Sequence, residues 1–128
     1  MAIEREALRT ESAPAPVGPY SQAMRAGELV FTSGQIPMDP ESGDIVSGDI
    51  RQEAEQVFRN LDEVLKAAGT SLRRAVKLTV FLTDMAHFGA VNEVYARFFE
   101  EPFPARSCVE VAALPKGVRI EAEAVAVV

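Results

Sequence analysis

Apolar and polar residues first form a strand-like pattern in two short segments that flank a turn. Residues 20–25 and 29–36 are rich in strand-forming types, and Ala26-Gly27-Glu28 between them has the composition of a turn. The sequence therefore predicts a β-hairpin. Before the hairpin, three prolines within residues 12–19 predict an extended, stiff loop that positions Tyr20.

A helical period replaces this pattern between Asp49 and Gly69. Asp49 can cap the first turn, with Gln52 reaching back to it, and Gly69 can supply the left-handed residue that ends a helix. Apolar residues fall on one stripe at this period: Ile50, Ala54, Val57, Phe58, Leu61, Val64, Leu65 and Ala68. The segment is predicted to be a long amphipathic helix with one buried side.

The second half of the chain continues with a strand, a helix and two closing strands. Residues 76–82 alternate with a period of two, and Asp84 can cap a second helix that ends before the Pro-Phe-Pro stretch at 102–104. Closing strands are expected over residues 105–112 and 118–128. The Leu-Pro-Lys-Gly segment between them is short enough for a turn, so we expect these two strands to pair as a hairpin.

Together these elements predict one domain over residues 1–128, of the α+β class, with two helices packed on one face of a mixed sheet. Residues 5–10 could add an edge strand. The closing strand carries apolar residues on both faces, with Ile120, Ala122, Ala124 and Ala126 on one and Val125 and Val127 on the other. A partner subunit could cover the second face.

Charge and composition exclude several functional classes. The formal net charge of -6 and the absence of a Lys/Arg cluster argue against nucleic acid as a partner. A single His and a single Cys are too few for a zinc or copper site within one chain, although a carboxylate site for Mg²⁺ stays open. Because neither a signal-peptide core nor a membrane span is visible, we expect a cytoplasmic protein without membrane contact.

Arg106 and Glu121 are the first candidates for chemistry. Arg106 begins a strand of small and apolar residues, where its guanidinium could bind a substrate carboxylate through two parallel hydrogen bonds. It could instead form a structural salt bridge with Glu110, Glu121 or Glu123. We expect Glu121 to lie on the strand next to Arg106, where it could act as a general base toward water or simply form that ion pair.

Cys108 and Tyr20 are weaker candidates for a functional role than Arg106 and Glu121. Cys108 has no His or helix N-terminus nearby in sequence to lower its pKa, which favours a packed side chain or a pocket wall over a nucleophile. Tyr20 could be a pocket wall with a hydroxyl donor, or part of the core.

Four stretches of sequence resemble the reactive intermediate deaminase family, and in particular its RidA subgroup. They are Ala-Pro-Val-Gly-Pro-Tyr-Ser-Gln-Ala (15–23), Phe-Thr-Ser-Gly-Gln-Ile-Pro (31–37), Val-Asn-Glu-Val-Tyr (91–95) and Pro-Ala-Arg-Ser-Cys-Val-Glu-Val-Ala-Ala-Leu-Pro-Lys-Gly (104–117). The resemblance runs from about residue 10 to the C-terminus, in order and with small differences in length. Residues 100–103 are shorter than in many relatives, which affects the rim of the expected cleft.

This resemblance implies a chorismate-mutase-like fold of the bacillus type and a homotrimer with sites between subunits. It also implies hydrolysis of the small-molecule substrates 2-iminobutanoate and 2-iminopropanoate to 2-oxo acids and ammonia, with no metal and no cofactor. Arg106 matches the arginine that binds the carboxylate, and Glu121 matches the glutamate that positions water. The remaining matches are the cleft residues Tyr20, Ser33, Gly34, Asn92 and Cys108, the last through its backbone N–H.

Two other functions remain open at this point. Some members of the family are described as ribonucleases or translation inhibitors, but one His and an acidic chain offer little for phosphate binding or RNA cleavage. The cleft could also bind small acids without turning them over.

Overall fold

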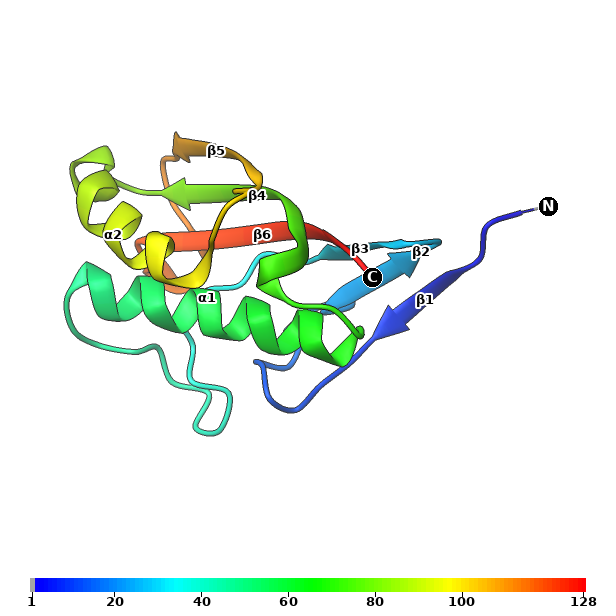
Figure 1. The fold of residues 1–128 in the computed structure, drawn as a ribbon. Helices are drawn as coiled ribbons and strands as arrows, with labels where there is room; N and C mark the ends of the chain where they lie inside the picture. The colour runs from blue at the N-terminus through cyan, green and yellow to red at the C-terminus, as the bar shows by residue number, and fades with distance from the viewer. Residues whose placement is uncertain (1) are drawn as a thin grey trace.

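The computed structural model describes residues 2–128, whose six strands form one sheet in the order β1-β2-β3-β6-β4-β5. Figure 1 shows both long helices on the same side of this sheet. The strands are β1 (Arg5–Leu8), β2 (Ala23–Ala26), β3 (Leu29–Thr32), β4 (Ala75–Leu82), β5 (Ala105–Glu110) and β6 (Ile120–Val127), and the helices are α1 (Ile50–Ala67) and α2 (Phe88–Phe98). Since β4 and β5 are parallel and the other pairs antiparallel, the sheet is mixed and the predicted α+β class is confirmed.

Both helices form where the sequence predicts them. Asp49 and Gln52 exchange hydrogen bonds between side chain and backbone, at 3.1 and 3.0 Å, and so form the capping box at the start of α1. Gly69 follows the helix with a φ of 84°. Asp84 accepts a hydrogen bond from the Ala86 N–H at 2.8 Å and caps the 3₁₀ turn η2 (Met85–His87) that leads into α2. None of the helices within residues 2–128 is long and apolar enough to cross a membrane.

The predicted hairpin of the two closing strands is wrong. β4 lies between β5 and β6 (Figure 1), pairing in parallel with β5 and antiparallel with β6. The connecting segment contains the 3₁₀ turn η3 (Pro115–Gly117) and carries the chain across the end of β4. A short connection keeps the ends of two strands close together, but it does not require the two strands to pair with each other. The sequence alone therefore did not reveal that β4 lies between β5 and β6.

The two faces of the sheet differ in burial. Toward the helices lie Leu78, Val80 and Leu82 of β4 and the alternate residues of β6, all of them buried; the latter are Ile120, Ala122, Ala124 and Ala126. On the opposite face, Leu29, Phe31 and Val109 are 38 to 44% exposed, and Val125 and Val127 are half-buried. The apolar second face expected from the closing strand therefore extends over several strands.

Candidate functional site

Arg106 lies on the helix-facing side of the sheet, because its partner across the β4–β5 ladder is the buried Leu78. The Nη1 group of Arg106 donates a hydrogen bond to the Asn92 side chain at 2.7 Å. The guanidinium carbon lies 4.5 Å from the centre of the Tyr95 ring and 5.5 Å from that of Phe88. Strand β5 and helix α2 thus place one cation among an amide and two aromatic rings.

The salt bridge considered for Arg106 does not form within a single chain. Among residues 2–128, Arg106 has no carboxylate within ion-pair distance. Glu110, which shares its strand face, instead accepts a hydrogen bond from the Met85 N–H at 2.9 Å. The guanidinium of Arg106 therefore keeps N–H groups available for an anion from outside the chain.

A cavity of about 420 Å³ opens beside this arginine. Its lining combines Arg106 and Asn92 with the apolar surfaces of Tyr95, Ala96, Phe103 and Pro104. Phe103 is 57% exposed and forms part of the rim. A charged fork beside apolar walls suits a small carboxylic acid with an apolar side chain.

Glu121 lies on the other side of the sheet. It is paired with Phe81, which points away from the helices, whereas Arg106 is paired with Leu78. The expectation that Glu121 lies on the strand adjacent to Arg106 is therefore wrong, since β4 separates the two strands and the side chains leave the sheet on opposite faces. One chain cannot bring both groups to the same substrate across its own sheet.

The surroundings of Glu121 suit a proton acceptor. Burial raises the pKa of its carboxyl above the usual range, and the negative charge of Glu123 on the same face raises the pKa further. Gly34 packs directly against this carboxyl, since a Cβ at Gly34 would lie 2.8 Å from the Glu121 carboxyl carbon. A side chain at position 34 would therefore displace the Glu121 carboxyl from this position.

Ser33 and Tyr20 belong to the same part of the molecule as Gly34. The Ser33 hydroxyl donates a hydrogen bond to the Ser21 carbonyl at 2.6 Å, which ties the segment after the proline loop to the end of β3. Tyr20 is 47% exposed, and its hydroxyl accepts a hydrogen bond from the Val17 N–H at 3.3 Å. The predicted residues thus form two groups. One group is joined by contacts, from Ser21 beside Tyr20 to Ser33 and from Gly34 to Glu121. The other group lies around β5 and consists of Asn92, Arg106 and Cys108.

Cys108 faces the helices beside the buried Val80 and is itself half-buried. Burial raises the pKa of its thiol, although the positive charge of Arg106 opposes this effect in part. A thiol with a raised pKa is protonated at neutral pH and is a poor nucleophile. The backbone of Cys108 is better placed for binding, because β5 is an edge strand with one side unpaired.

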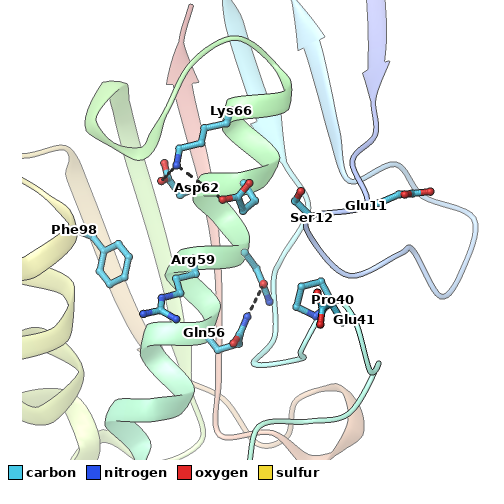
Figure 2. A pocket seen from close by; sticks show the side chains of 11 residues that line it. Glu11, Ser12, Pro40, Glu41, Gln56, Arg59, Asp62, Lys66 and Phe98 are labelled. Atoms are coloured by element: carbon cyan, nitrogen blue, oxygen red, sulfur yellow. Dashed lines mark hydrogen bonds and ion pairs between the residues drawn. The ribbon is translucent and has the colours of Figure 1, made fainter.

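A second cavity, of about 540 Å³, lies over the outer side of α1 (Figure 2). The two cations that line it are already paired, as Lys66 contacts Asp62 at 3.2 Å and Arg59 contacts Glu55 at 2.7 Å. The Gln56 amide donates to Asn60 at 2.9 Å. With its cations and amides satisfied internally, this cavity is a weaker candidate than the one beside Arg106.

Sequence reasoning missed Tyr95 and Phe88, the two rings that flank the arginine. A signal existed for Tyr95, because residues three apart on a helix share a face and Asn92 precedes it by three positions.

No group of three or more His, Cys, Asp or Glu side chains within residues 2–128 is arranged to hold a metal ion.

Known proteins resemble this chain in sequence and in overall fold. The family described as endoribonuclease L-PSP matches residues 10–128. A RutC family protein from Pyrococcus horikoshii is 53% identical over 95% of this chain and 97% of its own length. The 2-iminobutanoate/2-iminopropanoate deaminase of Homo sapiens is 50% identical over 96% of this chain and 90% of its own. The crystal structure of RidA from a Psychrobacter species superimposes with a TM-score of 0.93 at 45% identity, covering 96% of this chain and 99% of that one.

Proposed function

The chain belongs to the reactive intermediate deaminase family, and we propose that it hydrolyses 2-imino acids to 2-oxo acids and ammonia. The family model that matches it carries the description endoribonuclease L-PSP. Substrates of this class include 2-iminobutanoate and 2-iminopropanoate. The observation that carries the proposal is Arg106, held by Asn92 and Tyr95 next to a cavity with apolar walls. A guanidinium so placed suits the carboxylate of a small 2-imino acid.

In the proposed reaction, water adds to the carbon of the C=N bond. Arg106 binds the carboxylate, and Glu121 takes a proton from the attacking water while the imine nitrogen takes one from solvent, giving a carbinolamine. Glu121 then returns its proton to the nitrogen, the C–N bond breaks and ammonia leaves, and the hydroxyl proton passes to solvent as the new C–O bond becomes a carbonyl. The sum is imine plus water to 2-oxo acid plus ammonia. The step involves no electron transfer and therefore needs no redox cofactor, and we propose that it runs without a metal.

We further propose that the site is completed by a second copy of the chain in a homotrimer. Arg106 and Glu121 leave opposite faces of one sheet, so a substrate can meet both only where two chains meet. The exposed apolar face, with Leu29, Phe31 and Val109, offers a surface for that contact. In this arrangement Glu121, Gly34, Ser33 and Tyr20 of one chain face Arg106, Asn92 and the Cys108 backbone of its neighbour.

The oligomer can be tested through Phe31, which is 44% exposed in a single chain. We expect the protein to have the mass of three chains of 13.9 kDa each by light scattering. Phe31→Glu should dissociate it, because burying an unpaired carboxylate at an interface costs several kcal/mol, and should abolish imine hydrolysis.

Ile3→Glu is the matched control, since Ile3 is 76% exposed and lies before the first strand. It should leave both the mass and the activity unchanged. A wild-type protein that is a monomer at micromolar concentration, or an active monomeric Phe31→Glu variant, would contradict the proposal.

The pH dependence tests the proposed role of Glu121. A general base must be deprotonated, so activity should fall as pH falls through its pKa, and burial together with Glu123 places that fall at higher pH than for an ordinary glutamate. Glu123→Gln removes the repulsion and lowers the pKa of Glu121. The acid side of the pH–kcat profile should therefore move to lower pH, and an unchanged profile would argue against Glu121 as the base.

The activity itself can be measured by supplying the imine continuously. A pyridoxal-phosphate dehydratase acting on threonine or serine releases the imine, and 2-oxo acid formation is followed with and without the protein. We expect the protein to accelerate this step above the spontaneous rate. Labelled RNA incubated with the same sample should stay intact, because the chain has a net charge of -6 and a single His.

A further inference from the structure

The contacts of Arg106 raise the question of what fixes its guanidinium. In the chain from residue 2 to residue 128, its one hydrogen bond goes to Asn92, and it forms no ion pair. Its nearest aromatic neighbour is Tyr95, at 4.5 Å from guanidinium carbon to ring centre. A ring face attracts a cation without using its N–H groups, whereas a carboxylate would occupy them.

Tyr95 is itself held firmly. It is 7% exposed, stacks on Phe99 with ring centres 4.2 Å apart at 27°, and meets the edge of Phe58 at 5.6 Å. Phe58 belongs to α1, so the packing of the two helices fixes the Tyr95 ring. The ring is therefore a rigid surface under Arg106 and not a mobile side chain.

The hydroxyl of Tyr95 takes no visible part in this arrangement. It is buried, and within residues 2–128 it has no hydrogen-bond partner. A buried hydroxyl without a partner does not stabilise the fold. The contribution of Tyr95 to the site must then come from its ring.

We propose that Tyr95 is a positioning residue whose ring face holds the Arg106 guanidinium in the orientation that receives the substrate carboxylate. This inference rests on the proposed function, because it assigns a role within the same site. With Asn92 fixing Nη1 and Tyr95 fixing the plane of the guanidinium, the arginine is ordered before substrate arrives. Substrate binding then does not have to immobilise this flexible side chain.

The test compares Tyr95→Leu with Tyr95→Phe in the full-length protein. Three quantities are measured on folded samples: KM and kcat for imine hydrolysis, and Kd for 2-oxobutanoate by calorimetry. Tyr95→Phe keeps the ring and should stay within about threefold of wild type in each. Tyr95→Leu removes the ring and should raise KM and Kd about tenfold, with a smaller change in kcat, as expected for loss of a cation–π contact.

Phe98→Leu is the matched control for damage to the aromatic core. Phe98 packs against Phe58, with ring centres 5.5 Å apart, and among the aromatic contacts of Arg106 only Phe88 and Tyr95 occur within the described residues. Phe98→Leu should lower Tm and leave KM and Kd unchanged. Should Tyr95→Leu fail to fold, Tyr95→Met replaces it with the same expected shift.

Two results would overturn the inference. One is a folded Tyr95→Leu or Tyr95→Met variant with wild-type KM and Kd, and the other is a Tyr95→Phe variant as impaired as Tyr95→Leu. If wild type binds 2-oxobutanoate but hydrolyses no imine, the proposed function fails, and the Kd comparison alone decides the role of Tyr95. If wild type neither binds a 2-oxo acid nor hydrolyses imine, both proposals fail; if it hydrolyses imine without binding a 2-oxo acid, the KM comparison decides the role of Tyr95.

Discussion

Arg106→Lys is expected to lower kcat/KM for imine hydrolysis by about 2 to 4 kcal/mol, or roughly 30- to 700-fold, while leaving stability almost unchanged. Lysine keeps the positive charge but loses the fork of parallel N–H donors. Stability should hold because Arg106 has no carboxylate partner within residues 2–128. Thermal unfolding and steady-state kinetics on one sample measure both effects.

Arg119→Lys is the matched control, because Arg119, unlike Arg106, forms an ion pair within the chain. It pairs with Glu53, whose side chain is 6% exposed, and also donates to the Gly48 carbonyl at 3.0 Å. Replacing it with lysine should destabilise the fold by about 1 to 3 kcal/mol and leave turnover per folded chain intact. If Arg106→Lys behaves like Arg119→Lys, the carboxylate-binding role of Arg106 is wrong.

Glu121→Gln is expected to lower kcat by about a hundredfold to ten-thousandfold, the usual contribution of a general base. The amide has the same shape but cannot accept the proton of water. Binding should survive, because in the proposed site Arg106 of the neighbouring chain holds the carboxylate of the ligand. Steady-state assays of imine hydrolysis give kcat, and calorimetry with 2-oxobutanoate gives Kd, so the effects on catalysis and on binding are measured separately.

Glu123→Gln provides the comparison on the same strand face. It should retain kcat near its optimal pH, since Glu123 is exposed and affects Glu121 only through its charge. A Glu121→Gln variant with kcat within tenfold of wild type would mean that another group activates the water.

Local signals in the sequence predicted much of the fold. The apolar stripe and the Asp49–Gln52 capping box define α1 because both depend on residues within a few turns of one another. The hairpin of β2 and β3 is local in the same way. Pairing of the closing strands is not local, since it depends on β4 having formed between them, and the short Leu114–Gly117 connection carried no information about that strand.

The site was predictable as a set of residues and not as an arrangement. Arg106, Asn92 and Glu121 follow from motifs, but which face of the sheet each occupies depends on the register of β4 with both of its neighbours. The packing of Gly34 against Glu121 joins residues far apart in sequence. Tyr95 was missed because an apolar position on an amphipathic helix is normally assigned to the hydrophobic core. Its ring does pack in the core against Phe99, but it also contacts the Arg106 guanidinium.

Complementation between inactive variants tests the central claim, that imines are hydrolysed at a site shared by two chains. Arg106→Lys and Glu121→Gln chains with different tags are coexpressed, and oligomers containing both are isolated and assayed for imine hydrolysis. A mixed trimer holds two copies of one variant and one of the other, so about one third of its interfaces combine an intact Arg106 from one chain with an intact Glu121 from the next. We therefore predict about a third of wild-type activity, from two variants that are each nearly inactive alone. Mixed oligomers that remain as inactive as the separate variants would contradict the shared site.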